Sequence, residues 1–156
     1  MECIKLNDLD PEFKDLVADQ PGGEGIKVCF GCKACTASCP IAKVEQGYDP
    51  RKIIRKALLG MKKEVLSDEF IWLCSSCYSC AEVCPQNVRF TDVIFAIKNL
   101  AVLEGCVPPG LTAQKSLLKQ YGRLYEITDF ENDKREKLGL PKIVQHAGDF
   151  DRLLTD

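Results

Sequence analysis

The sequence predicts a mainly α-helical fold, and three observations lead to this prediction. First, helix-starting and helix-ending residues flank several stripes of apolar residues spaced three and four apart. Second, no segment shows the alternation of apolar and polar residues that is typical of a half-buried strand. Third, two cysteine-rich segments are separated by the 34 residues from 40 to 73, and these residues have a helical pattern.

The first expected helix lies in "DLDPEFKDLVADQPGG". Asp10 is the expected N-cap, and Pro11 takes the first helical position because that position needs no backbone donor. The apolar face consists of Phe13, Leu16 and Val17. The sequence Pro-Gly-Gly at 21–23 ends this helix.

A second helix is expected in "YDPRKIIRKALLG", between the two cysteine-rich segments. Asp49 is its N-cap, Pro50 its first residue, and Gly60 ends it. Its apolar stripe consists of Ile53, Ile54, Ala57 and Leu58. The segment "DEFIWLC" that follows is expected to form a short helical turn leading to Cys74.

A third helix is expected over 92–104, in "RFTDVIFAIKNLAVLEG". Its apolar face consists of Val93, Ile97, Leu100 and Leu103, widened by Ile94 and Ala101. The prolines at 108 and 109 end it, and "TAQKSLLKQYG" predicts one further helix. The tail after residue 125 is polar with scattered apolar residues, so both an extended and a helical conformation remain open.

Four cysteines and a proline occur twice with the same spacing, in "CFGCKACTASCP" from Cys29 and in "CSSCYSCAEVCP" from Cys74. Each cysteine of the first segment has a counterpart 45 residues later, whereas little else in the two segments matches. The repeat therefore lies in the cysteines, which indicates that it serves the chemistry of their thiols.

The spacing C-x2-C-x2-C-x3-C-P is that of bacterial ferredoxins, in which it binds 4Fe–4S clusters. Three thiolates two residues apart can surround one cluster, and the fourth, after a longer gap, reaches the neighbouring cluster. The predicted ligands of the first cluster are Cys29, Cys32, Cys35 and Cys84. Those of the second are Cys74, Cys77, Cys80 and Cys39. The sequence thus predicts two 4Fe–4S clusters in a helical frame.

Zinc and disulfides explain this pattern less well. Structural zinc sites use two C-x2-C pairs separated by a longer loop, rather than a cysteine triplet with a distant fourth ligand. The N-terminus lacks the basic and apolar regions of a secretory signal, so we expect a cytoplasmic, reducing environment in which thiols stay unpaired. Cys3 and Cys106 are left over and are expected to be small buried hydrophobic residues.

Composition excludes several other classes of function. The chain has 156 residues, of which 46% are hydrophobic, and a formal net charge of −2, so general affinity for nucleic acid is not expected. Apolar runs are too short for a membrane span. We find no G-x-G-x-x-G loop, no adjacent Cys-Cys pair and a single histidine, His146, in the polar tail. These features indicate an electron carrier without a substrate site of its own.

The pairing of "CFGCKACTASCPIAKVEQGYDPRKIIRKALLG" with "IWLCSSCYSCAEVCPQNVRFTDVIFAIKNLA" resembles the C subunit of heterodisulfide reductase. The resemblance covers roughly residues 25–125 and implies an α-helical ferredoxin domain there. Residues 1–24 would then be an N-terminal extension with a short helix. Residues 126–156 would be a C-terminal tail that docks onto a partner.

Membership of that family implies a non-catalytic electron-transfer subunit of an oxidoreductase. Its expected partners are a flavin- and iron–sulfur-containing subunit, which bifurcates electrons in methanogenesis, and a cysteine-rich catalytic subunit, which reduces the CoM-S-S-CoB heterodisulfide. Two alternatives remain open. One is a freestanding two-cluster ferredoxin, and the other is an iron–sulfur subunit of another complex, of the sulfur-oxidising or flavin dehydrogenase type.

Overall fold

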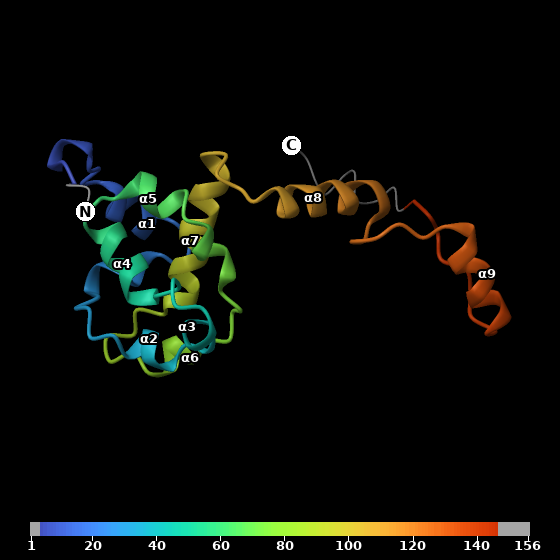
Figure 1. The fold of residues 1–156 in the computed structure, drawn as a ribbon, viewed down its shortest axis with the longest axis horizontal. Helices are drawn as coiled ribbons and strands as arrows, with labels where there is room; N and C mark the ends of the chain where they lie inside the picture. The colour runs from blue at the N-terminus through green and yellow to red at the C-terminus, as the bar shows by residue number, and fades with distance from the viewer. Residues whose placement is uncertain (1–3, 147–156) are drawn as a thin grey trace. The chain divides into compact units, whose positions relative to one another are not determined.

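The computed structural model describes residues 4–146, which form helices and turns, with no β-strand in that range. The chain divides into two compact units, residues 1–106 and 107–156, which are described separately. The α-helices of the first unit are α1 (Phe13–Ala18), α2 (Ala34–Ser38), α3 (Pro40–Val44), α4 (Pro50–Leu58), α5 (Lys62–Leu66), α6 (Ser79–Glu82) and α7 (Phe90–Leu103). Its 3₁₀ helices are η1 (Leu6–Asp8), η2 (Glu24–Val28) and η3 (Glu69–Leu73). The predicted mainly α-helical class is confirmed (Figure 1).

Helix α4 forms as its sequence signals predict. The Asp49 carboxylate accepts a hydrogen bond from the Lys52 backbone amide at 3.1 Å, and Pro50 occupies the first helical position. Three of the four predicted stripe residues are buried, and Leu58 is half-buried. Gly60 follows the helix with φ of 79°, a left-handed conformation that glycine adopts without strain.

Helices α1 and α7 differ in detail from the prediction. Asp10 accepts a hydrogen bond from the Glu12 amide in a turn, and α1 begins only at Phe13. Because α1 is short, only Phe13 and Val17, four residues apart, face the core, and Leu16 is 40% exposed. Helix α7 begins at Phe90, and Leu103 in its last turn is 78% exposed, which corrects its assignment to the apolar face.

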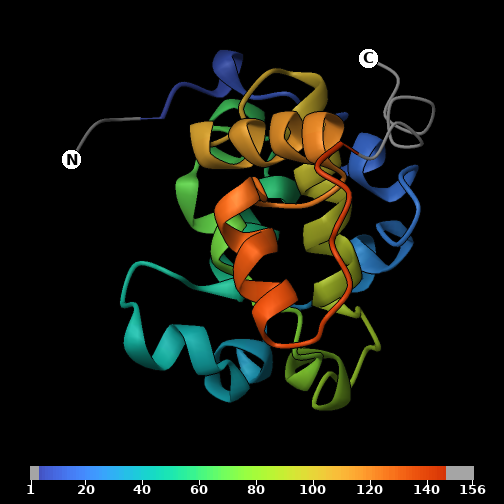
Figure 2. The ribbon, with the colours of Figure 1, turned by 90° about the vertical axis from the view of Figure 1, so that its right-hand side faces the viewer.

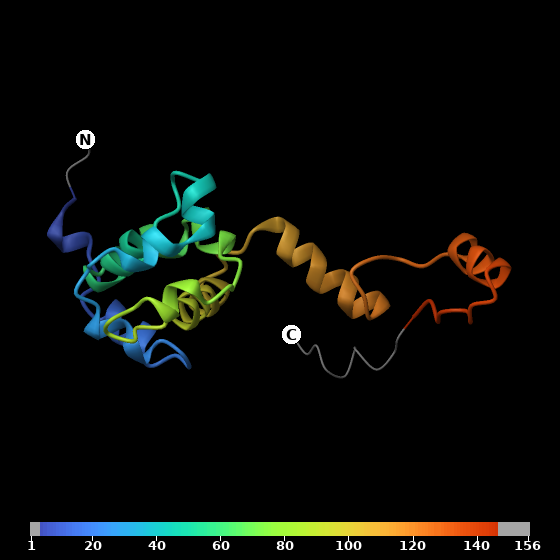
Figure 3. The same ribbon diagram turned by 90° about the horizontal axis from the view of Figure 1, so that it is seen from below.

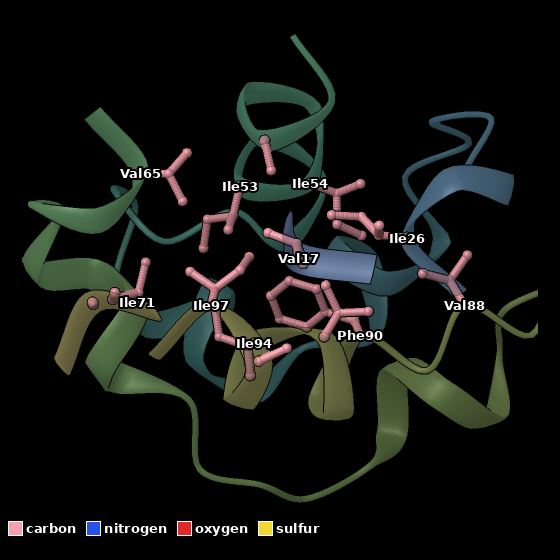
Figure 4. Close-up of a cluster of buried hydrophobic side chains, with 14 of the residues drawn as sticks. Val17, Ile26, Ile53, Ile54, Val65, Ile71, Val88, Phe90, Ile94 and Ile97 are labelled. Atoms are coloured by element: carbon pink, nitrogen blue, oxygen red, sulfur yellow. The ribbon is translucent and has the colours of Figure 1, made fainter. Parts of the chain in front are cut away.

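The core of the first unit joins its two sequence halves (Figure 4). Ile26 of η2 and Ile71 of η3 are both fully buried, and they pack in one cluster with residues of α1, α4 and α7. Among these are Val17 and Ile97, both also fully buried. Ile26 and Ile71 are 45 positions apart, so the repeat seen in the cysteines extends to the apolar residue that precedes each cysteine-rich loop.

The backbone repeats with the same period. Residues 24–28 and 69–73 both form 3₁₀ helices, and α2 and α6 follow the two loops. Within the two cysteine loops, left-handed backbone conformations occur in matching pairs: Gly31 (φ 76°) with Ser76 (φ 56°), and Lys33 (φ 73°) with Tyr78 (φ 62°). Three of these four residues are not glycine, and such conformations cost free energy that the surrounding structure must supply. The two cysteine loops therefore share a conformation that their side chains alone do not predict.

The second unit shows that the tail after residue 125, whose conformation the sequence left open, is partly helical. It contains α8 (Pro109–Tyr121) and α9 (Asp129–Lys137) (Figure 3). Thr128 and Glu131 form a capping box at the start of α9. The segment after α9 is not helical up to residue 146, and the Asn132 side chain holds it by exchanging hydrogen bonds of 3.0 and 2.9 Å with the backbone of Ile143.

Candidate iron–sulfur centre

The two cysteine loops lie side by side at one end of the first unit. Helices α2 and α6, which carry the third cysteine of each run, are in contact, and Figures 1 and 2 show them together. Packing of α2 against α4, and of α6 against α7, fixes the two loops to the apolar core. The fold therefore brings together thiols that are 45 residues apart in sequence.

Two cavities lie among these thiols. The wall of the first includes Cys29, Cys32, Cys35, Cys80 and Cys84. The wall of the second includes Cys39, Cys74, Cys77 and Cys80. Cys84 thus lies with the first cysteine run, and Cys39 with the second.

The two cavities share part of one wall. Cys80 and Phe90 line both of them. Cys39 and Cys80 are buried, each 8% exposed, whereas Cys32 of the first cavity and Cys77 of the second are exposed. The thiol sites are therefore adjacent to one another on the inside, and each has one cysteine at the molecular surface.

Hydrogen-bonding groups surround the thiols. The Val88 amide donates to Cys84 Sγ at 3.3 Å, and the hydroxyls of Thr91 and Ser79 lie 3.3 and 3.5 Å from the sulfurs of Cys80 and Cys77. Metal-ligating thiolates are acceptors, and hydrogen bonds to their sulfurs are among the determinants of cluster potential. These contacts suit deprotonated, metal-bound cysteines.

Burial has a strong effect on the thiols at the centre of the site. Desolvation raises the pKa of Cys35 to about 11, and burial also raises the pKa of Cys80. The Ser79 hydroxyl has the opposite effect on exposed Cys77, whose pKa it lowers. A buried thiolate needs a compensating positive charge, which iron ions supply. Cavities walled by the thiols of both cysteine runs therefore fit 4Fe–4S clusters.

Two residues that the sequence analysis assigned only to a helix start belong to this site. Tyr48 lines the second cavity and is 2% exposed, while Arg51 lines the first. Burial, together with the negative charge of Cys74, raises the pKa of Tyr48 well above its ordinary value, so its hydroxyl stays a proton donor. The signal for both was present in "YDPR", a Tyr and an Arg on either side of a helix cap.

A lysine lies near the second cavity. Lys98 of α7 is half-buried, and its Nζ lies 5.8 Å from the centroid of the Trp72 ring and 5.2 Å from that of Phe95. Burial lowers the pKa of Lys98, and the charge of the Cys74 thiolate acts in the opposite direction. Its ammonium group is thus a cation close to a cysteine of the second site.

The remaining candidate residues lie elsewhere. Cys106 is half-buried rather than buried, and it lines neither thiol cavity, while Cys3 lies outside the described residues. His146 is exposed in the second unit, where its ring stacks on Tyr121 with 5.8 Å between centroids. Across residues 4–146, every helix is too short or too polar to cross a bilayer.

Comparison with known proteins agrees with this geometry. Residues 25–88 match the family model of the 4Fe-4S dicluster domain. This range contains all eight cysteines of the two runs. The chain therefore holds two 4Fe–4S clusters, as its cysteine spacing predicts.

Several curated proteins are similar along most of their length. The C subunit of the H(2):CoB-CoM heterodisulfide,ferredoxin reductase of Methanothermobacter thermautotrophicus is 34% identical over 98% of this chain and 82% of its own. The iron-sulfur C 2 subunit of the CoB–CoM heterodisulfide reductase of Methanocaldococcus jannaschii is 33% identical over 90% and 78%. The C2 subunit of the H(2)/formate:CoB-CoM heterodisulfide,ferredoxin reductase of Methanococcus maripaludis is 45% identical over 83% and 72%. From its two thiol-lined cavities and these relatives, we conclude that the chain belongs to the family of heterodisulfide reductase C subunits.

Proposed function

We propose that this chain is the electron-relay subunit of a heterodisulfide reductase complex and has no substrate site of its own. The observation that carries the proposal is the pair of adjacent cavities with a common wall of Cys80 and Phe90. When bound, a 4Fe–4S cluster accepts and returns single electrons at a potential set by its surroundings. Two neighbouring sites, each with an exposed cysteine, suit a chain that receives electrons from one protein and delivers them to another.

The proposed ligands follow the crossed pattern of the motif. Cys29, Cys32, Cys35 and Cys84 hold the cluster of the first cavity. Cys74, Cys77, Cys80 and Cys39 hold that of the second. Cys80 lines both cavities, and its hydrogen bond with Thr91 and its place in the second cysteine run support its assignment to the second cluster.

The proposed partners are two other subunits of the same complex. A flavin- and iron–sulfur-containing subunit supplies the electrons, and a cysteine-rich catalytic subunit uses them to reduce the CoM-S-S-CoB heterodisulfide. This proposal is supported by relatives whose names describe subunits of CoB–CoM heterodisulfide reductases. In this proposal the complex is of the electron-bifurcating type and works in the energy metabolism of methanogenesis.

We also propose that the C-terminal residues dock onto a partner. Helix α8 buries no side chain within its own unit. Large apolar side chains of the second unit are exposed, among them Leu124, Tyr125, Phe130, Leu138 and Val144. A surface rich in exposed apolar side chains is typical of interfaces. The compact unit that begins at residue 107 is larger than the tail at 126–156 expected from the sequence, and both contain most of these residues.

Cluster content and ligand pairing can be tested on the purified chain. Protein prepared without oxygen should contain about eight irons and eight sulfides, as two 4Fe–4S clusters require. Cys39→Ala should disturb the paramagnetic signal of the cluster held by Cys74 and Cys77, and Cys84→Ala that of the other cluster. Cys106→Ala is the control and should leave both signals unchanged. If each variant instead affects the cluster nearest to it in sequence, the crossed pairing is wrong.

The relay role needs a test with partners. The chain, reduced by a dye, is mixed with CoM-S-S-CoB in the presence and absence of the cysteine-rich subunit. Turnover is expected only with that subunit, and it should be lost in Cys77→Ala. Turnover by the chain alone would contradict the absence of a substrate site. Electron transfer to many unrelated acceptors, with no binding to the other subunits, would favour the freestanding ferredoxin.

A further inference from the structure

Buried polar atoms without a hydrogen-bond partner are rare, and their positions in this chain are informative. Among the described residues, three buried side-chain nitrogen or oxygen atoms have no partner: Tyr48 Oη, Arg51 Nε and Arg123 Nη1. Arg123 belongs to the second unit. The other two line the two thiol cavities, one in each. An unsatisfied buried donor in a native structure calls for an explanation, such as an acceptor that belongs to a bound group.

Tyr48 meets this condition at the second cavity. Its side chain is 2% exposed, and its hydroxyl is out of contact with solvent. The cavity that it lines is bordered by Cys39, Cys74 and Cys77. Burying a hydroxyl without a partner destabilises the fold, whereas a phenylalanine in its place would avoid this cost. The acceptors that the cavity offers, once occupied, are the sulfurs of a cluster and of its ligands.

Arg51 has the same relation to the first cavity. Its backbone amide donates to Thr36 Oγ1 at 3.3 Å, so the main chain next to it is satisfied, but the side-chain Nε is buried without an acceptor. The cavity wall contains Cys29, Cys32 and Cys84 beside it. Arginine keeps its positive charge under all ordinary conditions, and its N–H groups are strong donors to anionic sulfur.

One short segment therefore reaches both cavities. Tyr48 and Arg51 are three residues apart, on either side of Asp49 and Pro50. The Asp49 carboxylate fixes this turn, since it accepts hydrogen bonds from the Lys52 amide at 3.1 Å and from Thr36 Oγ1 at 2.6 Å. Because the segment is held at its centre, the side chain of Tyr48 is fixed at the second cavity and that of Arg51 at the first.

We propose that Tyr48 and Arg51 each donate a hydrogen bond to a sulfur atom of the cluster site that they line, and that each donor raises the reduction potential of that one cluster. This proposal rests on the ligand pairing given above. Reduction adds one electron, supplied by the partner, and no bond or proton changes place. The donors favour the form that carries the additional negative charge. Tyr48 acts on the second cluster and Arg51 on the first.

The test is a potentiometric titration of each cluster, monitored by its paramagnetic signal under anaerobic conditions. The signals are assigned beforehand with Cys39→Ala and Cys84→Ala. Tyr48→Phe removes only the hydroxyl, and Arg51→Met removes the guanidinium. We expect each variant to lower the reduction potential of its own cluster by about 59 mV. This shift corresponds to about a tenfold change in the one-electron equilibrium constant.

Two matched controls separate the hydrogen bonds from general effects. Tyr125→Phe removes a tyrosine hydroxyl from an exposed residue of the second unit that lines neither thiol cavity. Lys52→Met removes a positive charge from an exposed residue of α4 that lines neither thiol cavity. Both controls should leave the one-electron equilibrium constant of each cluster within threefold of its wild-type value. The proposal is overturned if the one-electron equilibrium constant of the affected cluster changes less than threefold in Tyr48→Phe or Arg51→Met. It is also overturned if either variant shifts the potentials of both clusters equally.

Further variants keep the proposal testable if a substitution prevents cluster assembly. Fluorotyrosine at position 48 is a stronger donor of nearly the same shape, so it should raise the potential of the second cluster, and a potential that stays constant or falls overturns the role of Tyr48. Arg51→Lys keeps the charge but loses the planar donor, so its potential should fall between those of arginine and methionine. Iron content and ligand pairing are measured separately, so a failure of the proposed function would appear there.

Discussion

Replacing Asp49 by alanine should weaken the attachment of the first cysteine loop to α4. Asp49 is 8% exposed, and its carboxylate joins two elements, since it caps α4 through Lys52 and accepts a hydrogen bond from Thr36 of α2 at 2.6 Å. Burial acts to raise the pKa of Asp49, but these hydrogen bonds outweigh it and lower the pKa. The carboxylate is therefore ionised at neutral pH, and its stabilising contribution is lost only as the pH falls below about 4.

The size of the effect follows from the two interactions. Loss of an N-cap costs about 1 kcal/mol. Loss of a hydrogen bond to a charged acceptor costs about 2 kcal/mol. If the total of about 3 kcal/mol is expressed fully in the unfolding rate, Asp49→Ala loses its native structure about 150-fold faster than the wild type.

The decay of cluster absorbance in a fixed concentration of urea, without oxygen, measures this rate. A rate is preferable to an equilibrium constant because unfolding with loss of a metal centre is not a reversible two-state process. Asp49→Asn keeps an acceptor for both donors and should lie between alanine and the wild type. Asp8→Ala, at an exposed position, is the control and should have no effect. A decay of Asp49→Ala within twofold of the wild type would refute the argument.

Three further predictions concern packing, charge and metal. Gly23→Ala would place a Cβ well inside contact distance of the backbone oxygen of Val17, so its melting temperature should fall sharply, whereas Gly110→Ala meets open space and should melt like the wild type. Lys98→Met should lower the potential of the second cluster in the same titration, because a cation near Cys74 is lost, and Lys98→Arg should preserve it. Removal of iron by a chelator should abolish the cooperative thermal transition, since thiolate ligation is part of folding, and a transition that persists in calorimetry would show that the apolar core folds independently.

Features that depend on only a few neighbouring residues, such as helix ends and cluster-binding loops, could be predicted from the sequence. The helix start at Asp49 and Pro50, and its end at Gly60, follow from the backbone geometry of those residue types, and the structure agrees. The two clusters followed from cysteine spacing, because the reach of a thiolate along a short loop depends on few residues. Their confirmation by the 4Fe-4S dicluster domain needed no tertiary information beyond that spacing.

Helix boundaries and exposed faces were less predictable. Leu16 and Leu103 have the periodicity of core residues but are exposed, because α1 and the last turn of α7 have too few neighbours to cover them. The helix α9 was undecided from sequence, since its low apolar content leaves only the capping box of Thr128 and Glu131 as a signal. Propensity is a weak guide where packing decides.

The sequence by itself determined which chemistry this protein contains, through eight thiols in two identical spacings, and it determined the helix between them. Only the tertiary structure decided which residues surround that chemistry. Tyr48 and Arg51 have no motif of their own, and their side chains reach different cavities because α2 packs against both α4 and α6. Lys33 and Tyr78 adopt the same left-handed conformation although their side chains have nothing in common. Short-range spacing is encoded residue by residue, whereas burial and orientation depend on contacts between segments far apart in the chain.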